Sequence, residues 1–405
     1  MPDTRSTLEL TATAMAAGGD AVTRDDRGRV VFVRGALPGE RVAAEVVDER
    51  TDFARAVAVA VIQPSPDRVA PPCPHVARGC GGCGWQHVEP AAQRRLKVGI
   101  VAEALRRQGG LDEPAVRSAG PLPTTGFRTS VRLAVGPAGP GYRRHHDHEV
   151  VAVDSCAIAH PRLEELVAVG RFGAAGEVTL RCGAATGERL ALVSPTAEGV
   201  RLPDDVVVVG TDELRAGRRA WIHEELAGRR FRISARSFFQ ARPDGALQLV
   251  EAVRAALAGA PDGPLADLYG GVGLFGATVA GRRRVTLVER SPSSVADARA
   301  NLPGARVLLL DVDGWRPAPA AAVVADPSRA GLGRAGVRSV VGTGASNVAL
   351  VSCDPASLGR DARLLADAGY RHDGSTVVDL FPHTPHVEVV SRFIRDGGPL
   401  RRRRA

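Results

Sequence analysis

The hydrophobic pattern of the chain changes twice between its two ends. Over residues 7–63, short Val- and Ala-rich runs alternate with turns that contain Gly, Asp and Pro. Runs of this length, closely spaced and without a helical period, predict strands at 29–35, 40–47 and 54–62. They favour a small β-barrel of the OB type. The Pro-rich stretch 64–74 that follows is typical of a stiff linker.

The second change comes after a stretch of mixed character. Residues 90–109 carry an apolar stripe with the period of a helix, and residues 126–240 return to strand-like runs. From residue 243 onward, predicted helices and strands alternate along the chain. Such alternation is the signature of a doubly wound parallel sheet, so we expect an α/β domain in the C-terminal part.

The composition is that of a globular protein with an excess of positive charge. The chain has 405 residues, 44% of them hydrophobic, and its 53 basic and 45 acidic residues give a net charge of +8. A positive charge suits an anionic partner such as nucleic acid. A GC-rich genome that prefers Arg codons produces the same excess, and Lys97 is the only lysine.

The sequence carries no sign of export or membrane insertion. The N-terminal stretch has no apolar core of the signal-peptide kind, and no apolar run approaches the roughly 18 residues of a membrane span. We therefore expect a cytoplasmic protein without a membrane partner. In a reducing compartment, the six cysteines are expected to be ligands, catalysts or core residues rather than disulfides.

A glycine-rich turn follows the first strand of the C-terminal pattern. In DLYGGVGLFG, Gly271, Gly273 and Gly276 have GxGxxG spacing, which allows a tight turn and a close approach of backbone to ligand. Glu289 ends the next predicted strand, where an acid can bind a ribose diol. This pattern fits a nicotinamide or flavin dinucleotide as well as S-adenosylmethionine. Asp267, placed to hold the amino-acid end of a ligand, and a thiol at a later strand end favour S-adenosylmethionine.

Four cysteines form a candidate metal site. Three of them lie within eleven residues in CPHVARGCGGCGWQH, and VDSCAIAHP supplies a candidate fourth ligand: Cys73, Cys80, Cys83 and Cys156. The spacing is compatible with structural zinc, with His75 or His87 as a possible ligand, and equally with an iron–sulfur cluster.

The two remaining thiols stand in strand-like runs. Cys182 is expected to be an ordinary core residue. Cys353, in LVSCDPASLG, follows an apolar run just before a helix begins. Packing is one interpretation, because free Cys is among the most buried residue types. The other is chemistry, because ligands in open α/β sheets sit just past the carboxyl ends of the strands.

Several of these stretches together resemble the RNA uracil-C5 methyltransferases, the S-adenosylmethionine enzymes that make 5-methyluridine in 23S ribosomal RNA or tRNA. The similar stretches run in family order along the chain: VVFVRGALPGERV, PCPHVARGCGGCGWQH, VDSCAIAHP, ISARSFFQAR, DLYGGVGLFG, VADPSRAGL, LVSCDPASLGRD and LFPHTPHVEVV. The resemblance implies an α/β fold with three parts. These are an OB-type TRAM RNA-binding domain at 1–66, a central β-rich domain with an iron–sulfur cluster at 67–236, and a class I, Rossmann-like methyltransferase domain at 237–405.

The resemblance also implies the residues of the site. It assigns Cys353 as the nucleophile that adds to carbon 6 of uracil, and Glu388 as the base. From the residues alone, a surface position on an edge strand is the favoured interpretation of Glu388. The resemblance implies a 4Fe–4S cluster on Cys73, Cys80, Cys83 and Cys156. It implies contacts to S-adenosylmethionine from Gln240, Tyr269, Glu289, Asp311 and Asp326.

The expected function is therefore that of an RNA (uracil-C5)-methyltransferase acting as a monomer, with 23S rRNA as the first expectation and tRNA as the alternative. The extruded uridine could stack on Phe238 or Phe239. The sequence departs from the family motifs at five positions, so the motifs do not decide which RNA is the substrate: Gly270, Leu274, Ser328, Asp354 and His383.

Two functions of other classes fit parts of the sequence. They are a dinucleotide-dependent oxidoreductase with an iron–sulfur relay and a non-catalytic RNA-binding module.

Overall fold

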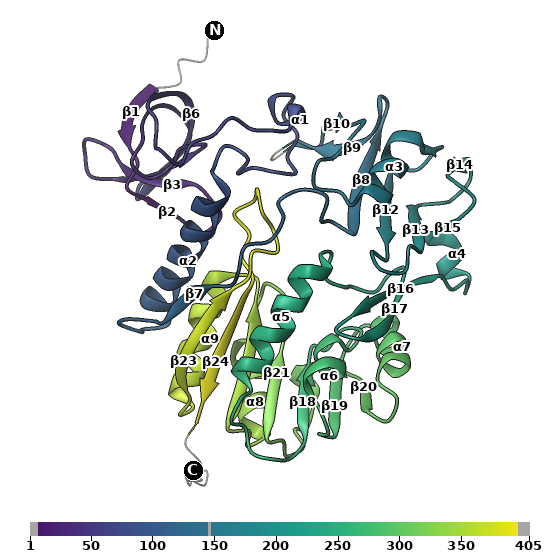
Figure 1. Cartoon of the computed structure of the whole chain (residues 1–405). Coiled ribbons are helices and arrows are strands. Elements are labelled where there is room, and N and C mark those ends of the chain that lie inside the picture. The colour runs from purple at the N-terminus through teal and green to yellow at the C-terminus, as the bar shows by residue number, and fades with distance from the viewer. Residues whose placement is uncertain (1–6, 145–146, 396–405) are drawn as a thin grey trace.

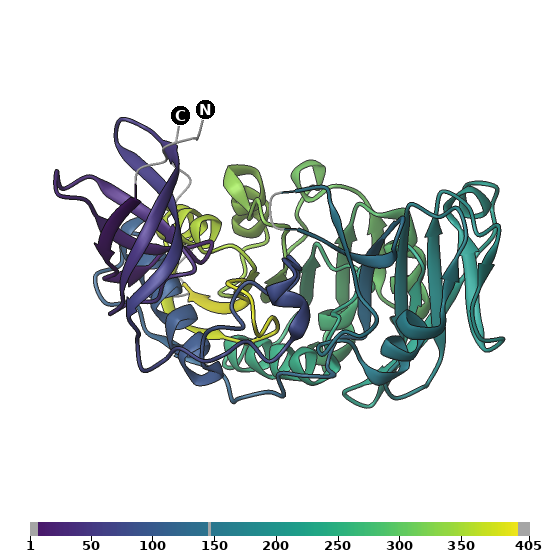
Figure 2. The same ribbon diagram turned by 90° about the horizontal axis from the view of Figure 1, so that it is seen from above.

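Three large β-sheets follow one another along the chain in the computed structural model, which describes residues 7–144 and 147–395 (Figure 1). The N-terminal and central sheets lie on opposite sides of the molecule, and the C-terminal sheet lies between them (Figure 2). The carboxyl ends of most C-terminal strands therefore face the space that the other two parts flank.

The N-terminal sheet has six strands in the order β1-β5-β6-β4-β3-β2. Its strands are β1 (Thr7–Thr11), β2 (Ala14–Met15), β3 (Ala21–Arg24), β4 (Val30–Arg34), β5 (Arg41–Glu49) and β6 (Phe53–Gln63). Buried and less buried side chains alternate along β4, where Val31 and Val33 point inward, because successive residues of a strand face opposite sides. The three strands predicted from the sequence in this part are confirmed.

The central sheet also has six strands, in the order β10-β9-β8-β12-β13-β15. Its strands are β8 (Ser130–Gly136), β9 (Gly139–Arg143), β10 (Val150–Ala152), β12 (Glu177–Cys182), β13 (Arg189–Ser194) and β15 (Val206–Gly210). Two small ribbons and three short helices accompany it: β11 (Arg171–Phe172) with β14 (Val200–Arg201), β16 (Trp221–Leu226) with β17 (Arg229–Ser234), α1 (Pro74–Ala77), α3 (Pro161–Val169) and α4 (Thr211–Arg215). Cys182 is buried at the end of β12, so its prediction as a core residue is confirmed.

The C-terminal sheet has eight strands in the order β20-β19-β18-β21-β22-β24-β23-β7. They are β7 (Val116–Ser118), β18 (Leu265–Leu268), β19 (Val285–Glu289), β20 (Arg306–Leu309), β21 (Ala322–Ala325), β22 (Asn347–Ser352), β23 (Arg371–Val377) and β24 (Val389–Ile394). On one face pack α5 (Pro243–Ala256), α6 (Leu274–Val279) and α7 (Pro292–Asn301). On the other pack α2 (Pro90–Arg107), α8 (Gly333–Gly342), α9 (Pro355–Asp367) and the 3₁₀ turn η1 (Val312–Gly314). The predicted doubly wound layering is confirmed.

One strand contradicts the expectation of a wholly parallel sheet. β24 lies between β22 and β23 and runs antiparallel to both. Glu388, which directly precedes β24, is therefore in the interior of the sheet and only 4% exposed, so the alternative of a surface Glu on an edge strand is wrong. In addition, α2 and β7 come from the stretch 67–236 and yet pack on the C-terminal sheet. The domain limits themselves stay predictions.

Helix α2 buries a charge where it meets the C-terminal part. Lys97 has no exposed surface, and its Nζ donates to Asp379 Oδ1 (2.7 Å) and to the Phe381 carbonyl (2.8 Å). Burial lowers the pKa of Lys97, and the Asp379 carboxylate opposes that effect.

Among the described residues no helix, α2 included, is long and apolar enough to cross a membrane.

Replacing Lys97 by Met should lower the free energy of unfolding by about 3–5 kcal/mol, because Asp379 would keep a buried charge without its partner. Denaturant unfolding would measure the loss. Arg106→Met on the same helix is the matched control, since Arg106 and its partner Glu103 are exposed and such pairs contribute about 0.2–1 kcal/mol. Equal losses in the two variants would contradict this prediction.

Candidate active site

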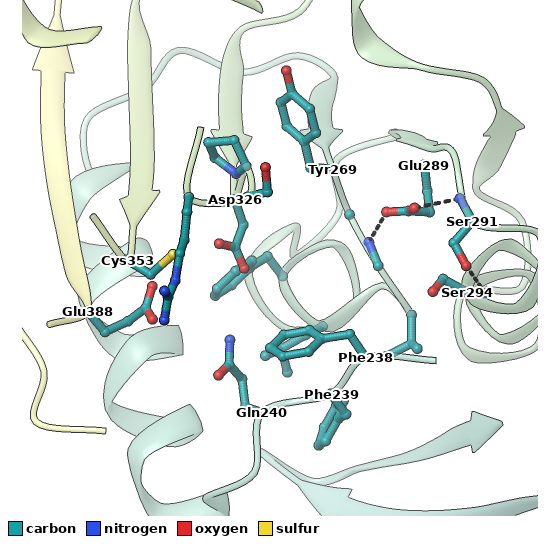
Figure 3. Close-up of a pocket in the computed structure, with 18 of the residues that line it drawn as sticks. Phe238, Phe239, Gln240, Tyr269, Glu289, Ser291, Ser294, Asp326, Cys353 and Glu388 are labelled. Carbon is teal, nitrogen blue, oxygen red and sulfur yellow. Dashed lines mark hydrogen bonds between the residues drawn. The ribbon is translucent and has the colours of Figure 1, made fainter. Parts of the chain in front are cut away.

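A cavity of about 770 Å³ opens where the parallel strands of the C-terminal sheet end. This is the edge at which open α/β sheets bind their ligands (Figure 3). All seven residues predicted as catalytic or cofactor-binding line it: Gln240, Tyr269, Glu289, Asp311, Asp326, Cys353 and Glu388. The fold therefore brings these side chains together, while their roles stay predictions.

The glycine-rich turn between β18 and α6 forms part of the cavity wall. Gly271 and Gly273 have left-handed φ values of +54° and +92°, and a Cβ on Gly273 would collide with the side chain of Leu302. Asp267 does not border the cavity, contrary to its predicted contact with a ligand. It is fully buried, and its Oδ2 accepts a hydrogen bond from the Gly276 N–H (2.8 Å). Asp267 therefore holds the turn against α6.

Two carboxylates follow neighbouring strands on one side of the cavity. Glu289 ends β19, where its Oε2 accepts from the Gly271 N–H (3.0 Å) and its Oε1 from the Ser291 N–H (2.7 Å). Asp311 comes just after β20, and its carboxylate lies 3.7 Å from the Arg290 guanidinium. Two acceptors at adjacent strand ends can hold a ribose diol, the role that the sequence suggested for Glu289.

Cys353 and Glu388 meet because of the strand register. In the antiparallel pairing of β22 with β24, Ser352 is opposite Val389. The next residue of each strand past this pair is Cys353 on one side and Glu388 on the other. Residues directly opposite in such a pair have Cβ atoms roughly 4.5–5.5 Å apart. Both side chains line the cavity, and Figure 3 shows the thiol and the carboxyl group side by side.

Burial disfavours the charged forms of three groups that line the cavity: Asp326, Cys353 and Glu388. It raises the pKa of Glu388 well above its usual range, and the nearby Asp326 carboxylate adds to this effect. Burial also raises the pKa of Asp326 to about 7. The Cys353 thiol has its pKa raised to about 11, first by burial and then by the charges of Glu388 and Asp326. A positive charge entering the cavity would therefore favour the ionised forms.

Arg329 is a cavity residue that the sequence reasoning missed. It follows β21 in VADPSRAGL and lines the cavity together with Cys353 and His386. Its guanidinium lowers the pKa of the Cys353 thiol and that of His386. The sequence does place Arg329 in the same strand-end motif as Asp326. Nearly all basic residues of the chain are arginines, however, so this one did not stand out as a candidate site residue.

The two adjacent phenylalanines have different surroundings. Phe238 is 65% exposed and lines the cavity, so its ring is free to stack on an entering base. Phe239 also lines the cavity, but it is partly buried and packs against the core residue Phe231 with ring centroids 5.7 Å apart. Of the two candidates for stacking, the structure favours Phe238.

Three departures from the family motifs have local structural reasons. A Cβ at Gly270 would lie 2.6 Å from Leu287 Cγ, so the Leu287 side chain occupies the space that a larger residue would need. Leu274 is buried in the apolar core beside α5. Asp354 caps α9, where its Oδ1 accepts from the Ser357 N–H (2.7 Å).

The four candidate ligand cysteines line a second, smaller cavity of about 40 Å³: Cys73, Cys80, Cys83 and Cys156. Gly82, Arg128 and Ile158 border this cavity and also the larger one, so the two are adjacent. Burial raises the pKa of Cys83 to about 11, and the other three thiols raise it further. Across 7–144 and 147–395, however, no three His, Cys, Asp or Glu side chains converge closely enough to hold a metal ion.

Known proteins match the chain over nearly its whole length. Residues 4–59 match the TRAM domain family. An uncharacterized RNA methyltransferase of Streptomyces avermitilis is 38% identical, over 93% of this chain and 95% of its own length. The 23S rRNA (uracil(1939)-C(5))-methyltransferase RlmD of Alkalilimnicola ehrlichii is 31% identical over 97% of each chain.

A solved structure shares the fold. The tRNA (uracil-54, C5)-methyltransferase of Pyrococcus abyssi, in complex with S-adenosyl-L-homocysteine, aligns with 95% of this chain and 99% of its own at a TM-score of 0.74 and 24% identity. Because the full-length relatives are RNA methyltransferases, the oxidoreductase and the non-catalytic binding module are wrong. The chain belongs to the RNA uracil-C5 methyltransferase family and carries a TRAM domain at its N-terminus.

Proposed function

We propose that this protein transfers a methyl group from S-adenosylmethionine to carbon 5 of a uridine in 23S rRNA, with Cys353 as nucleophile and Glu388 as general base. The observation that carries the proposal is the register of β22 and β24, which sets these two residues opposite each other in the cavity. Relatives named as 23S rRNA methyltransferases, at 31% and 32% identity, favour rRNA over tRNA.

The chemistry needs a thiolate on one side of the uracil and a base close to it. Carbon 5 of uracil is a poor nucleophile, but addition of the Cys353 thiolate to carbon 6 gives carbon 5 carbanion character. Covalent catalysis of this kind divides one difficult step into easier ones. After methylation, Glu388 removes the proton from carbon 5, and the bond between carbon 6 and sulfur breaks. Burial raises the pKa of Glu388, so its carboxylate, once ionised, is a stronger base than that of an exposed Glu.

The uridine has to leave its base stack to reach Cys353. Enzymes that act on a base inside folded nucleic acid extrude it into a pocket and read it by stacking and hydrogen bonds. Phe238, exposed at the cavity, offers a ring for that stacking. Arg329 supplies a positive charge beside the thiol, which favours the thiolate and the negative charge that develops on the uracil ring.

The methyl donor fits the remaining wall of the cavity. Glu289 and Asp311 would hold the ribose hydroxyls beside the glycine-rich turn, and Tyr269, Gln240 and Asp326 would contact the rest of the molecule. S-adenosylmethionine supplies the methyl group and a positively charged sulfonium, which suits a cavity whose buried acids carry raised pKa values.

The four cysteines of the smaller cavity would hold a 4Fe–4S cluster. The support is that all four line the same small cavity, and four Cys thiolates are the usual ligand set of such a cluster. The cluster would tie residue 156 to the stretch 73–83 beside the active site. No step of the proposed reaction transfers electrons, so its role there is structural.

The catalytic pair should fail in two different ways. Cys353→Ala cannot add to carbon 6, so methyl transfer and the covalent protein–RNA adduct should both disappear. Glu388→Gln still allows addition and methylation, but the carbon 5 proton has no base, and the methylated RNA should stay attached to Cys353. Denaturing gels with labelled RNA would show a slow band for Glu388→Gln and none for Cys353→Ala.

The same gels test the substrate, with a 23S rRNA fragment and a tRNA transcript run in parallel. We expect the adduct with the rRNA fragment. An adduct with tRNA alone would replace rRNA by tRNA as the substrate. Near-normal turnover by Cys353→Ala would show that the thiol is structural, and the mechanism would be wrong.

Protein purified without oxygen should contain about four irons per chain. Metal analysis after Cys83→Ser should show a large loss of iron, because Cys83 lines the cluster cavity. Cys182→Ser is the matched control, since Cys182 lies in the core of the central sheet, and it should keep its iron. One zinc per chain with no iron would overturn the cluster proposal.

The reactivity of Cys353 in the free protein should rise steeply with pH. With its pKa raised to about 11, roughly a thousandth of the thiol is ionised at pH 8, and alkylation should speed up about tenfold per pH unit below that pKa. Arg329→Ala removes a cation that lowers this pKa, so alkylation should be slower at each pH. Peptide mapping by mass spectrometry would follow Cys353.

The control for this measurement is Arg363→Ala on the outer side of α9, where the guanidinium lies 3.5 Å from the exposed Asp367 carboxylate. It should leave the alkylation rate unchanged. Equal rates for the wild type and Arg329→Ala would show that Arg329 does not stabilise the thiolate.

A further inference from the structure

The loop that joins β23 to β24 has two sides with different neighbours. The Val378 N–H donates to the Glu388 carbonyl (2.8 Å), which closes the loop at its base. One side faces the active-site cavity with Phe381, Pro382, Thr384, His386, Val387 and Glu388. His383 and Pro385 do not border the cavity, and they contact other parts of the chain.

His383 is fixed in an unusual backbone conformation. Its φ is +64°, a left-handed value that few residues other than Gly adopt. Its N–H donates to Gln93 Oε1 (2.6 Å), and its carbonyl accepts from the Trp85 N–H (2.8 Å). These bonds tie the middle of the loop to α2 and to the cysteine-rich stretch.

The imidazole of His383 is also fixed. Its Nε2 lies 3.1 Å from the Thr124 carbonyl, which can only accept, so Nε2 carries the proton. Its unprotonated Nδ1 lies 3.4 Å from Gln93 Nε2. Burial lowers the pKa of His383, which keeps the ring neutral; Lys97 acts in the same direction and Asp379 in the opposite one.

The N-terminal domain reaches this loop through one turn. Trp85 Nε1 donates to the Gly19 carbonyl (3.2 Å), in the turn between β2 and β3. A Cβ on Gly19 would lie 2.5 Å from Pro385 Cβ and 2.8 Å from Trp85 Nε1. Gly19 therefore lies directly against the loop that leads to Glu388, with no room for a larger residue.

We propose that the turn at Gly19, together with Trp85 and His383, positions the loop 379–387 and thereby places Glu388 for its proton transfer. This inference rests on the proposed role of Glu388. The N-terminal domain then does more than bind RNA: it supports the last step of catalysis. His383 and Trp85 act through Glu388, so they are positioning residues and not catalytic ones.

The step that this coupling supports is the release of product. The carbon 5 proton passes to the Glu388 carboxylate, the electrons of that bond form the double bond between carbons 5 and 6, and the Cys353 thiolate leaves carbon 6. A base must be within hydrogen-bond reach of the proton that it takes, and a displacement of about 1 Å can cost a hundredfold in rate. Addition and methyl transfer use Cys353 and do not depend on the loop in this way.

The test compares two adjacent glycines. Gly18 and Gly19 have similar left-handed φ values of +97° and +95°, but a Cβ on Gly18 would meet no atom within 4 Å. Both Ala variants carry the same backbone strain, and only Gly19→Ala presses on Pro385 and Trp85. Single-turnover reactions with labelled methyl donor and RNA would give the rates of methyl transfer and of adduct decay.

For Gly19→Ala we expect adduct decay to slow about tenfold or more while methyl transfer stays near the wild-type rate. Gly18→Ala should match the wild type in both rates. His383→Ala should also accumulate adduct, and His383→Asn should recover part of the decay rate, because Asn tolerates left-handed φ and keeps polar atoms near Gln93. Should Gly19→Ala not fold, Trp85→Phe removes the bond to the Gly19 carbonyl and keeps an aromatic ring.

Two outcomes overturn the inference, and they are distinct. In the first, Glu388→Gln accumulates adduct, but the only effect of the other three variants is a higher KM for RNA: Gly19→Ala, Trp85→Phe and His383→Ala. The turn at Gly19 would then contribute to RNA binding and would not position the loop. In the second, Glu388→Gln itself accumulates no adduct. The proposed role of Glu388 would then be wrong, and so would the proposed coupling between the turn at Gly19 and Glu388.

Discussion

The antiparallel insertion of β24 between β22 and β23 is the constraint on which the site depends. If β24 ran parallel to β22, the residue that precedes β24 would lie at the other edge of the sheet, where β22 begins. Because β24 runs the other way, its first residues meet the last residues of β22, and positions 353 and 388 become neighbours although they are far apart in the sequence. Both strands have a neighbouring strand on each side, which fixes the register that brings the two positions together.

The charges of neighbouring groups influence the ionisation of the residues that this register brings together. Asp326, Glu388 and Cys353 share a buried region in which each negative charge makes the next one less favourable. The charged forms of these three groups are therefore disfavoured until a positive charge compensates them. The sulfonium of the proposed methyl donor would carry such a charge to the same strand ends. Binding of a positively charged methyl donor would then be linked to ionisation of Cys353 and Glu388, the proposed nucleophile and base.

Much of the fold could be predicted from the sequence, because local periodicity determines local structure. Three strands of the N-terminal sheet (β4, β5 and β6), the long helix α2, helices α5 and α7 and the strands from β18 to β22 follow from patterns that each element carries within itself. The antiparallel direction of β24 could not be predicted, since an apolar strand has the same pattern in either direction. The family resemblance brought Glu388 to attention, but only the register explains why it faces Cys353.

The residues that sequence reasoning misplaced depend on contacts between distant segments. Asp267 has the position of a ligand contact along the chain, but its burial under the glycine turn makes it a partner of the Gly276 N–H. Gly19 stands in an ordinary turn signal, and nothing in its neighbourhood in the sequence indicates that Pro385 and Trp85 lie against it. Trp85 belongs to the cysteine-rich stretch and contacts both the N-terminal turn and the catalytic loop. One segment thus connects the N-terminal domain, the candidate cluster and the loop that leads to Glu388, the proposed base.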